Sequence, residues 1–199
     1  FMIATGNSNR SASGGIWQTS RNNPGLPPKC GLDVALIVDL SGSVSGSLPD
    51  LKDAAKTLSN SLVGTPSRLA LYTFARFAPA NSSNNRNRPL TPVSTQAGAD
   101  QVNGWIDGFT AGGTTNWDRG FAQVAESPDS FDIAVIITDG NPTVYGQAAE
   151  GPGSFTRIRE VENGVFSANA LKDRGTRVLA LGVGAGVANA ANNLQSVSG

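Results

Sequence analysis

The chain has 199 residues, of which 39% are hydrophobic and 15% are charged, and its 15 basic residues balance its 15 acidic ones. This length suits either one domain of about 100–200 residues with a sizeable core or one domain that carries an extra arm. Because the net charge is zero and no basic cluster occurs, we expect no nucleic-acid partner. The absence of His and the presence of a single Cys exclude His-based zinc sites, triads with an imidazole base and an internal disulfide.

The first 30 residues differ in character from the rest. They are rich in Gly, Ser, Asn and Pro, which predicts an arm or linker over residues 1–30, packed through Trp17 if at all, before a domain over residues 31–199. The chain begins at Phe1 without the pattern of a signal peptide, as a processed or excised piece would. No apolar run approaches the roughly 18–20 residues that span a bilayer, so we expect no membrane insertion.

Continuous apolar runs recur along the domain. Such runs, as opposed to alternating ones, are typical of strands that are covered by helices on both faces of a sheet. They predict strands at residues 34–38, 69–74, 133–137 and 178–181.

Segments with helical spacing lie between these runs. The spacing predicts helices over 48–62, 99–106, 117–125, 158–171 and 188–194. Ser47 and Asp50 resemble a capping box at the start of the first helix. Two segments fit neither period: residues 81–88 are a polar loop with nothing to bury, and residues 141–154 are a Gly- and Pro-containing loop. Strands alternating with helices predict an α/β fold with a doubly wound, mostly parallel central sheet.

Oxygen-bearing side chains follow two of the predicted strands. Asp39, Ser41 and Ser43 come directly after the first strand, and Asp139 follows the strand at 133–137. In an open α/β sheet, ligands bind at the carboxyl ends of the strands, so these groups would lie at one edge if the two strands are neighbours. Thr114, in a Gly-Gly-Thr loop before a helix, offers a further hydroxyl.

These five side chains carry only oxygen donors, which suit the hard cations Mg²⁺, Mn²⁺ and Ca²⁺. Two carboxylates and three hydroxyls are too few for the six to eight oxygens that Ca²⁺ prefers, so Mg²⁺ or Mn²⁺, keeping some waters, fits better. An ion held in this way keeps an open coordination position. We therefore expect it to recruit a carboxylate from a partner protein.

The D-x-S-x-S pattern of Asp39, Ser41 and Ser43, followed in order by Thr114 and Asp139, resembles the metal-ion-dependent adhesion site of von Willebrand factor A (vWA) domains. The resemblance covers residues 33–199. It implies that these five residues are the metal ligands, that the two Ser hydroxyls bind directly, and that an acidic group of a protein ligand completes the octahedron. It implies no enzymatic activity.

The family usually ends with a sixth strand and a final helix, and neither has a counterpart after Leu194. The Asn- and Ser-rich first 30 residues are similar to the arms that flank vWA domains in pilus-tip adhesins of Gram-positive bacteria. The resemblance therefore implies a monomeric adhesion domain of a larger, secreted or wall-anchored surface protein. Cys30 lies where some extracellular vWA domains hold a cysteine that pairs beyond the last helix, and a free thiol is the alternative.

Each element also has a plainer interpretation. Asp39 to Ser43 alone could be a turn, Asp139 with Gly140 is a common turn, and Thr114 could be a helix N-cap. Outside the five, we expect Asp33 at a strand entrance and Trp117 in the core, with Asp118 either supporting the site or adding charge to a helix start. Tyr145 and Glu150 either rim the metal or belong to a mobile surface loop.

Two other functions remain open at this point. vWA domains also occur in intracellular chelatase and AAA-type complexes, where the same site docks an acidic finger of a partner. An enzyme would use Asp39 as a phosphoryl-accepting nucleophile beside a Mg²⁺ held by Asp139. We disfavour the enzyme because no Lys or second acid lies near those turns in the sequence.

Overall fold

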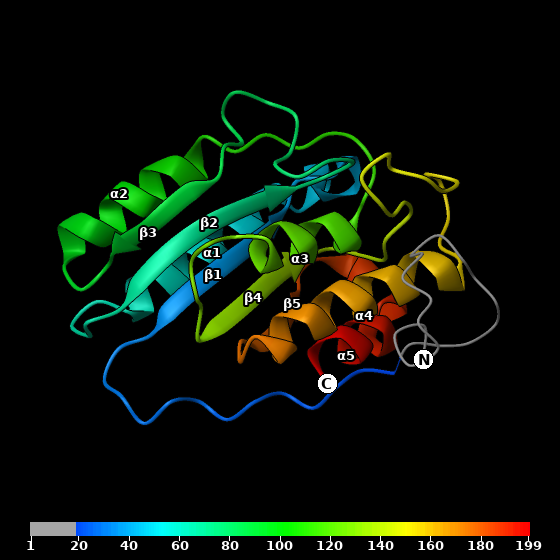
Figure 1. Cartoon of the computed structure of the whole chain (residues 1–199). Coiled ribbons are helices and arrows are strands. Elements are labelled where there is room, and N and C mark those ends of the chain that lie inside the picture. Colours follow the sequence, from blue (N-terminus) through cyan, green and yellow to red (C-terminus); the bar gives the residue numbers. More distant parts are fainter. Residues whose placement is uncertain (1–18) are drawn as a thin grey trace.

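The computed structural model describes residues 19–199, which form a sheet covered by helices on both faces (Figure 1). Its five strands run in the order β3-β2-β1-β4-β5. All neighbours are parallel except β2 and β3. The predicted doubly wound, mostly parallel sheet is therefore confirmed. The strands are β1 (Asp33–Asp39), β2 (Arg68–Phe74), β3 (Arg88–Pro92), β4 (Ile133–Thr138) and β5 (Arg177–Gly182).

The helices divide between the two faces of the sheet. One face packs against α1 and α2, and the other against α3, α4 and α5 (Figure 1). Two short 3₁₀ helices, η1 and η2, follow β1 and β5. The bounds are η1 (Gly42–Gly46), α1 (Leu48–Ser61), α2 (Gln96–Asp107), α3 (Trp117–Ala125), α4 (Ile158–Asp173), η2 (Ala185–Asn189) and α5 (Ala191–Ser198).

Strand β1 shows why the central strands read as unbroken apolar runs. Val34, Leu36 and Val38 enter the core on the α1 side, whereas Ala35 and Ile37 enter the core on the α3 side. Successive side chains of a strand point to opposite faces, so a strand covered on both sides needs apolar residues at every position. No helix among the described residues is long and apolar enough to cross a bilayer.

Strand β3 was not predicted. The segment before it, residues 81–88, was predicted to bury nothing, but it does contain a buried side chain. Asn85 is 2% exposed. Its side-chain amide donates to the carbonyl of Thr110 (2.8 Å) and accepts from the Thr110 N–H (3.0 Å). A polar side chain buried through backbone hydrogen bonds produces no hydrophobic period, so the pattern could not reveal it.

The start of α1 also differs from expectation. Ser47 is the N-cap residue, but its side chain makes no capping hydrogen bond and its Oγ lies 3.5 Å from the carbonyl of Val44. With φ −112° and ψ 10°, Ser47 lacks the extended backbone that a capping side chain normally has. The predicted capping box is therefore wrong, because η1 runs almost directly into α1.

Residues 19–24, which we call the strap, lie along the outer edge of β5 and the ends of α4 and α5. The Asn23 side chain accepts from the Val178 N–H (2.7 Å) and donates to the carbonyls of Val178 (2.9 Å) and Ser198 (2.5 Å). Lys172 donates to the carbonyl of Arg21 (2.8 Å). Part of the predicted arm is thus packed on the domain, whereas Trp17 lies outside the described residues.

Candidate metal centre

The centre lies at the carboxyl ends of β1 and β4. From β1 the sheet continues to β2 on one side and to β4 on the other. This is the kind of switch point at which open α/β sheets bind ligands, because the loops leaving the two strands diverge there. The loop after β1 carries Asp39, Ser41 and Ser43, and the loop after β4 begins with Asp139.

Asp39 is fixed by two hydrogen bonds at the end of the central strand. Its Oδ1 accepts from the backbone N–H of Ser41 (2.9 Å), and its Oδ2 accepts from the hydroxyl of Thr138 (2.5 Å). The side chain is completely buried. Thr138 was not among the residues predicted for the site, since the last residue of a buried strand gives no signal of its own.

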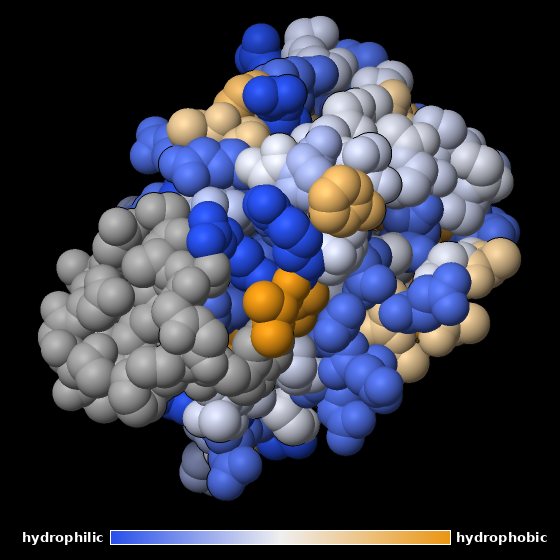
Figure 2. All heavy atoms as spheres, turned by 90° about the vertical axis from the view of Figure 1, so that its right-hand side faces the viewer, coloured by the Kyte–Doolittle hydropathy of each residue, from blue (hydrophilic) through white to orange (hydrophobic). Residues whose placement is uncertain are grey.

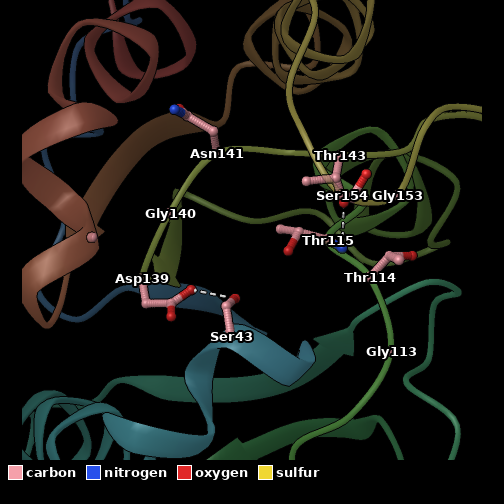
Figure 3. Close-up of a pocket in the computed structure, with 11 residues that line it drawn as sticks. Ser43, Gly113, Thr114, Thr115, Asp139, Gly140, Asn141, Thr143, Gly153 and Ser154 are labelled. Carbon is pink, nitrogen blue, oxygen red and sulfur yellow. Dashed lines mark hydrogen bonds between the residues drawn. The ribbon is translucent and has the colours of Figure 1, made fainter.

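The remaining donors form a continuous row of oxygens. The hydroxyls of Ser41 and Ser43 lie 3.0 Å apart, and Ser43 Oγ donates to Asp139 Oδ1 (2.9 Å). Figure 3 shows the Ser43 and Asp139 side chains turned toward each other across the gap between η1 and β4. Four of the five predicted residues, Asp39, Ser41, Ser43 and Asp139, therefore converge on one place.

The Gly-Gly-Thr loop is held against the loop after β1 by backbone hydrogen bonds. The Gly42 N–H donates to the carbonyl of Gly113, and the Gly112 N–H donates to the carbonyl of Leu40, both at 2.8 Å. Gly113 has φ +88°, a left-handed conformation that favours glycine. These bonds bring Thr114 and Thr115 to the border of the centre.

The two threonines point in different directions. In Figure 3 the hydroxyl of Thr114 faces away from Ser43 and Asp139, while the side chain of Thr115 extends toward them. Thr114 Oγ1 is buried without a hydrogen-bond partner among the described residues. The structure thus does not bring the Thr114 hydroxyl to the other donors. It offers Thr115 instead, and the adjacent identical residues gave the sequence no means of choosing between them.

Burial dominates the electrostatics of both carboxylates. Desolvation raises the pKa of Asp39 to about 7, against the hydrogen bonds from Thr138 and Ser41 that lower it, and the nearby Asp139 raises it further. Desolvation also raises the pKa of Asp139, while the Ser43 hydrogen bond lowers it. Neither carboxylate forms an ion pair with a side chain of residues 19–199. Two buried acids without a cationic partner are an arrangement that a bound cation would stabilise.

The donor set fits a small hard cation. Asp39, Ser41, Ser43, Asp139 and Thr115 offer oxygen only, which matches Mg²⁺ or Mn²⁺. Within residues 19–199, no three or more His, Cys, Asp or Glu side chains lie together in a way that could hold a metal ion. A cation here would therefore depend on hydroxyls and water as well as on the two carboxylates.

A pocket of about 330 Å³ opens above Ser43 and Asp139. Its other walls come from the Gly-Gly-Thr loop, from residues 141–154 after β4, which we call the rim loop, and from η2. The lining residues are Ser43, Gly113, Thr114, Thr115, Asp139, Gly140, Asn141, Thr143, Gly153, Ser154 and Gly186. The space could admit a side chain of a partner protein directly above the oxygen row.

The rim loop is tied to the start of α3. The carbonyl of Thr115 accepts from the N–H groups of Thr143 (2.8 Å) and Val144 (3.1 Å). Both backbone groups of Gly146 are hydrogen-bonded to this region. Its N–H donates to Asp118 Oδ2 (2.9 Å) and its carbonyl accepts from the Asn116 side chain (3.0 Å). These hydrogen bonds hold the rim loop in place. The alternative of a mobile surface loop is therefore not the better description of this segment.

The other sequence candidates have clear positions. Trp117 is fully buried in the core and Asp33 lies at the start of β1, both as expected. Asp33 also pairs with Arg68, which the sequence did not predict. Tyr145 is buried and its hydroxyl donates to Glu150 (3.0 Å). Neither of these two lines the pocket, so Asn141 and Thr143 form its rim instead. Cys30 is an exposed free thiol in the structure.

Asp118, the remaining candidate, is completely buried in the first turn of α3. It also accepts a short hydrogen bond from Ser167 of α4. Together with its bond to Gly146, this contact links α3, α4 and the rim loop. The sequence left open whether Asp118 supports the site or only adds charge to the start of a helix. The supporting role fits, because a carboxylate that only adds charge to a helix start would be exposed to water.

No protein-family model and no curated protein matches the sequence. Solved structures do match. Pilus adhesin SpaC from Lactobacillus rhamnosus GG shares 16% identity over 96% of this chain and 34% of that chain, with a TM-score of 0.66. A von Willebrand factor type A structure from Catenulispora acidiphila shares 13% identity over 92% of this chain and 43% of that chain, with a TM-score of 0.59.

The PilB minor pilin of Streptococcus sanguinis, as a D319A mutant, shares 14% identity over 86% of this chain and 54% of that chain, with a TM-score of 0.55. The chain therefore has a vWA-like fold, similar to those of pilus adhesins, and the predicted fold resemblance is confirmed. At these identities the likeness concerns the fold alone. The chain spans about a quarter to a third of the two SpaC chains that it matches.

Proposed function

We propose that this chain is a cation-dependent ligand-binding module of adhesion type, without catalytic activity, within a larger secreted or wall-anchored surface protein. The observation that carries the proposal is the row of oxygens from Ser41 through Ser43 to Asp139, beside the buried Asp39. The pilus-adhesin neighbours support the adhesion part of the proposal through the shared fold.

In this proposal one set of residues binds the cation, and the pocket above it admits the ligand. Asp39, Ser41, Ser43, Asp139 and Thr115 would hold Mg²⁺ or Mn²⁺, which when bound attracts an anionic oxygen at its open position. Asp39 is kept at the bottom by Ser41 and Thr138, so its carboxylate cannot swing away. Ser43 and Asp139 line the pocket above. An Asp or Glu side chain of a protein ligand would enter there.

Calorimetric titration of the purified protein with MgCl₂ and MnCl₂ tests the proposal. We expect binding by the wild type and its loss in Asp39→Asn and Thr115→Ala. Asp53→Asn, which changes an exposed carboxylate on α1, should bind as the wild type does. Thr114→Ala should also retain binding, because its hydroxyl faces away from the centre.

Two results would contradict the proposal. One is the absence of Mg²⁺ and Mn²⁺ binding by a wild-type protein that circular dichroism shows to be folded. The other is equal binding by the wild type and Asp39→Asn. Immunolabelling of intact source cells tests the surface location, and it should detect the protein without permeabilisation.

A further inference from the structure

The two most exposed large hydrophobic side chains of the described residues lie three positions apart, next to the metal centre. Ile158 is 64% exposed and Phe155 is 58% exposed. Figure 2 looks onto the face at the carboxyl ends of the strands and shows mostly hydrophilic side chains with small hydrophobic spots between them. Single exposed apolar residues need no explanation, so the case for a contact surface depends on how these two lie relative to the pocket of the candidate metal centre.

A second hollow of about 270 Å³ lies beside the first. Asn141 lines both hollows, so they meet at this residue. Phe155 stands in the sequence between Ser154, which lines the first, and Thr156, which lines the second. We call this second hollow the Ile158 groove; its lining residues are Asn141, Thr156, Arg157, Ile158, Val161 and Asn193.

Charge differs between the two sides of Asp139. A hollow of about 360 Å³ on the α1 side is lined by Asp50, an exposed acid. The Ile158 groove carries Arg157, whose side chain is 45% exposed while its partner Glu160 is fully buried. Arg157 and Glu160 balance each other's charge, and the groove is lined by no Asp or Glu, so an acidic segment is repelled on the Asp50 side and not on the side of the Ile158 groove.

The groove itself is well formed. Asn193 donates to Asn141 Oδ1 (2.9 Å), and Asn141 donates to the carbonyl of Asn189 (3.1 Å). The Arg157 N–H donates to Glu160 Oε2 (2.6 Å), which fixes the start of α4 and with it Ile158. Binding there costs little ordering of the protein, because the walls are already held in place.

We propose that the protein ligand crosses Asn141 into the Ile158 groove, so that a large apolar side chain near its metal-binding Asp or Glu packs on Ile158 and Phe155. This inference rests on the proposed function and adds to it a specificity: an acid alone is not the recognised feature. The occupant is an extended acidic segment with an aliphatic or aromatic residue within about four positions of the acid, a span that extended chain covers easily.

Selection from a phage library of random peptides tests this inference. Phages are bound to the wild-type protein in MgCl₂ and eluted with EDTA, and one enriched peptide is synthesised for fluorescence-anisotropy titration. We expect enriched peptides to contain an Asp or Glu with a large apolar residue close by. Ile158→Ser and Phe155→Ser should each weaken binding of that peptide about tenfold, as the loss of an apolar anchor does.

Control variants distinguish a specific effect of the groove on peptide affinity from the general effect of removing an exposed apolar side chain. Leu26→Ser removes an apolar side chain that is 50% exposed and lies before β1, and it should leave peptide affinity unchanged. Ile158→Leu should retain most of the affinity. Calorimetric titration with MgCl₂ should be the same for Ile158→Ser and the wild type, because Ile158 is not among the donors.

The outcomes distinguish this inference from the proposed function. If the wild type binds no Mg²⁺, the proposed function fails. If Mg²⁺ binds but the peptides show acids without apolar neighbours, or no peptide is enriched, the groove is not a ligand subsite. Equal peptide affinity of Ile158→Ser and the wild type, with intact Mg²⁺ binding, overturns the inference in the same way.

Discussion

Asp39 is the residue on which the chemistry of the centre depends most. A carboxylate that is completely buried and has no cationic partner within residues 19–199 is costly to ionise. The protein supplies it with hydrogen bonds from Ser41 and Thr138, which lower the cost only in part. A divalent cation at this point would remove the remaining cost, so metal binding and stability should be coupled at this residue.

The raised pKa of Asp39 gives the metal-free protein a pH-dependent stability. Its pKa is about 7 in the folded protein, against 3.8 for an aspartate surrounded by water. Below about pH 4 the carboxyl is protonated in both the folded and the unfolded state, and above it only the unfolded state loses the proton readily. Stability should therefore fall as pH rises from about 4 to 7, by about 4 kcal/mol in total for a shift of this size.

Urea denaturation in EDTA at a series of pH values measures this effect. The wild type should lose stability relative to Asp39→Asn over this pH range. MgCl₂ should remove the difference between the two proteins in how steeply the free energy of unfolding falls with pH. Comparing the two proteins cancels the contributions of other carboxyls. Parallel stability curves for the two proteins would show that Asp39 ionises in the folded state as readily as in water.

At the scale of elements, the start of α3 connects the candidate metal centre to the rim loop. Thr115 faces the centre, while Asn116 and Asp118 hold Gly146 of the loop. The buried Asp118 also reaches Ser167 on α4. One short stretch of chain thus fixes a donor residue and the loop above it together.

Replacing Asp118 by Asn tests this connection. The variant keeps the size of the side chain but loses one acceptor of the pair that holds Gly146 and Ser167, which should cost about 1–3 kcal/mol of stability. Hydrogen exchange at the Gly146 amide should accelerate. Asp100→Asn, an exposed change on α2, should alter neither quantity, and unchanged exchange at Gly146 in Asp118→Asn would contradict the role given to this carboxylate.

The elements that could be predicted from the sequence are those with a strong period. Helix α3 has the predicted bounds, 117–125, and the buried strands β1 and β4 begin and end within a residue or two of prediction. Strand β3 at the sheet edge was missed because its alternating, Pro-containing sequence resembles a loop. Edge strands bury fewer side chains, so tertiary pairing decides them and periodicity does not.

For the candidate site too, some residues could be predicted from the sequence and others depend on tertiary contacts. Asp39, Ser41, Ser43 and Asp139 could be placed together because the ends of buried parallel strands must share one edge. Thr115 and Thr138 could not, since which of two adjacent threonines faces the pocket depends on backbone hydrogen bonds between distant loops. The supporting carboxylate of Asp118 was named only as one of two alternatives for the same reason.

At the scale of the whole molecule, the strap covers the outer edge of the sheet at the start of β5. Asn23 meets both backbone groups of Val178 with its side-chain amide, as a neighbouring strand would with its backbone. An open edge is a site of unwanted pairing with other chains, and covering it is a common protection.

Asn23→Ala should therefore destabilise the protein by about 1–3 kcal/mol, because buried backbone groups of β5 lose their partners. Hydrogen exchange at the Val178 amide should accelerate, and size-exclusion chromatography should show more self-association. Asn22→Ala, an exposed change one position earlier, is the matched control. A Val178 amide that exchanges equally slowly in both variants would rule out the protective role of Asn23.

The strap has a mechanical consequence as well. Asn23 binds both β5 and the carbonyl of Ser198, so the two ends of the described chain are fastened to each other beside one edge of the sheet. Tension applied between residues 19 and 199 would load these few contacts before it reached the strands. The oxygen row at the ends of β1 and β4 would be sheltered from that tension, and a ligand held there would be released by forces on the ligand itself.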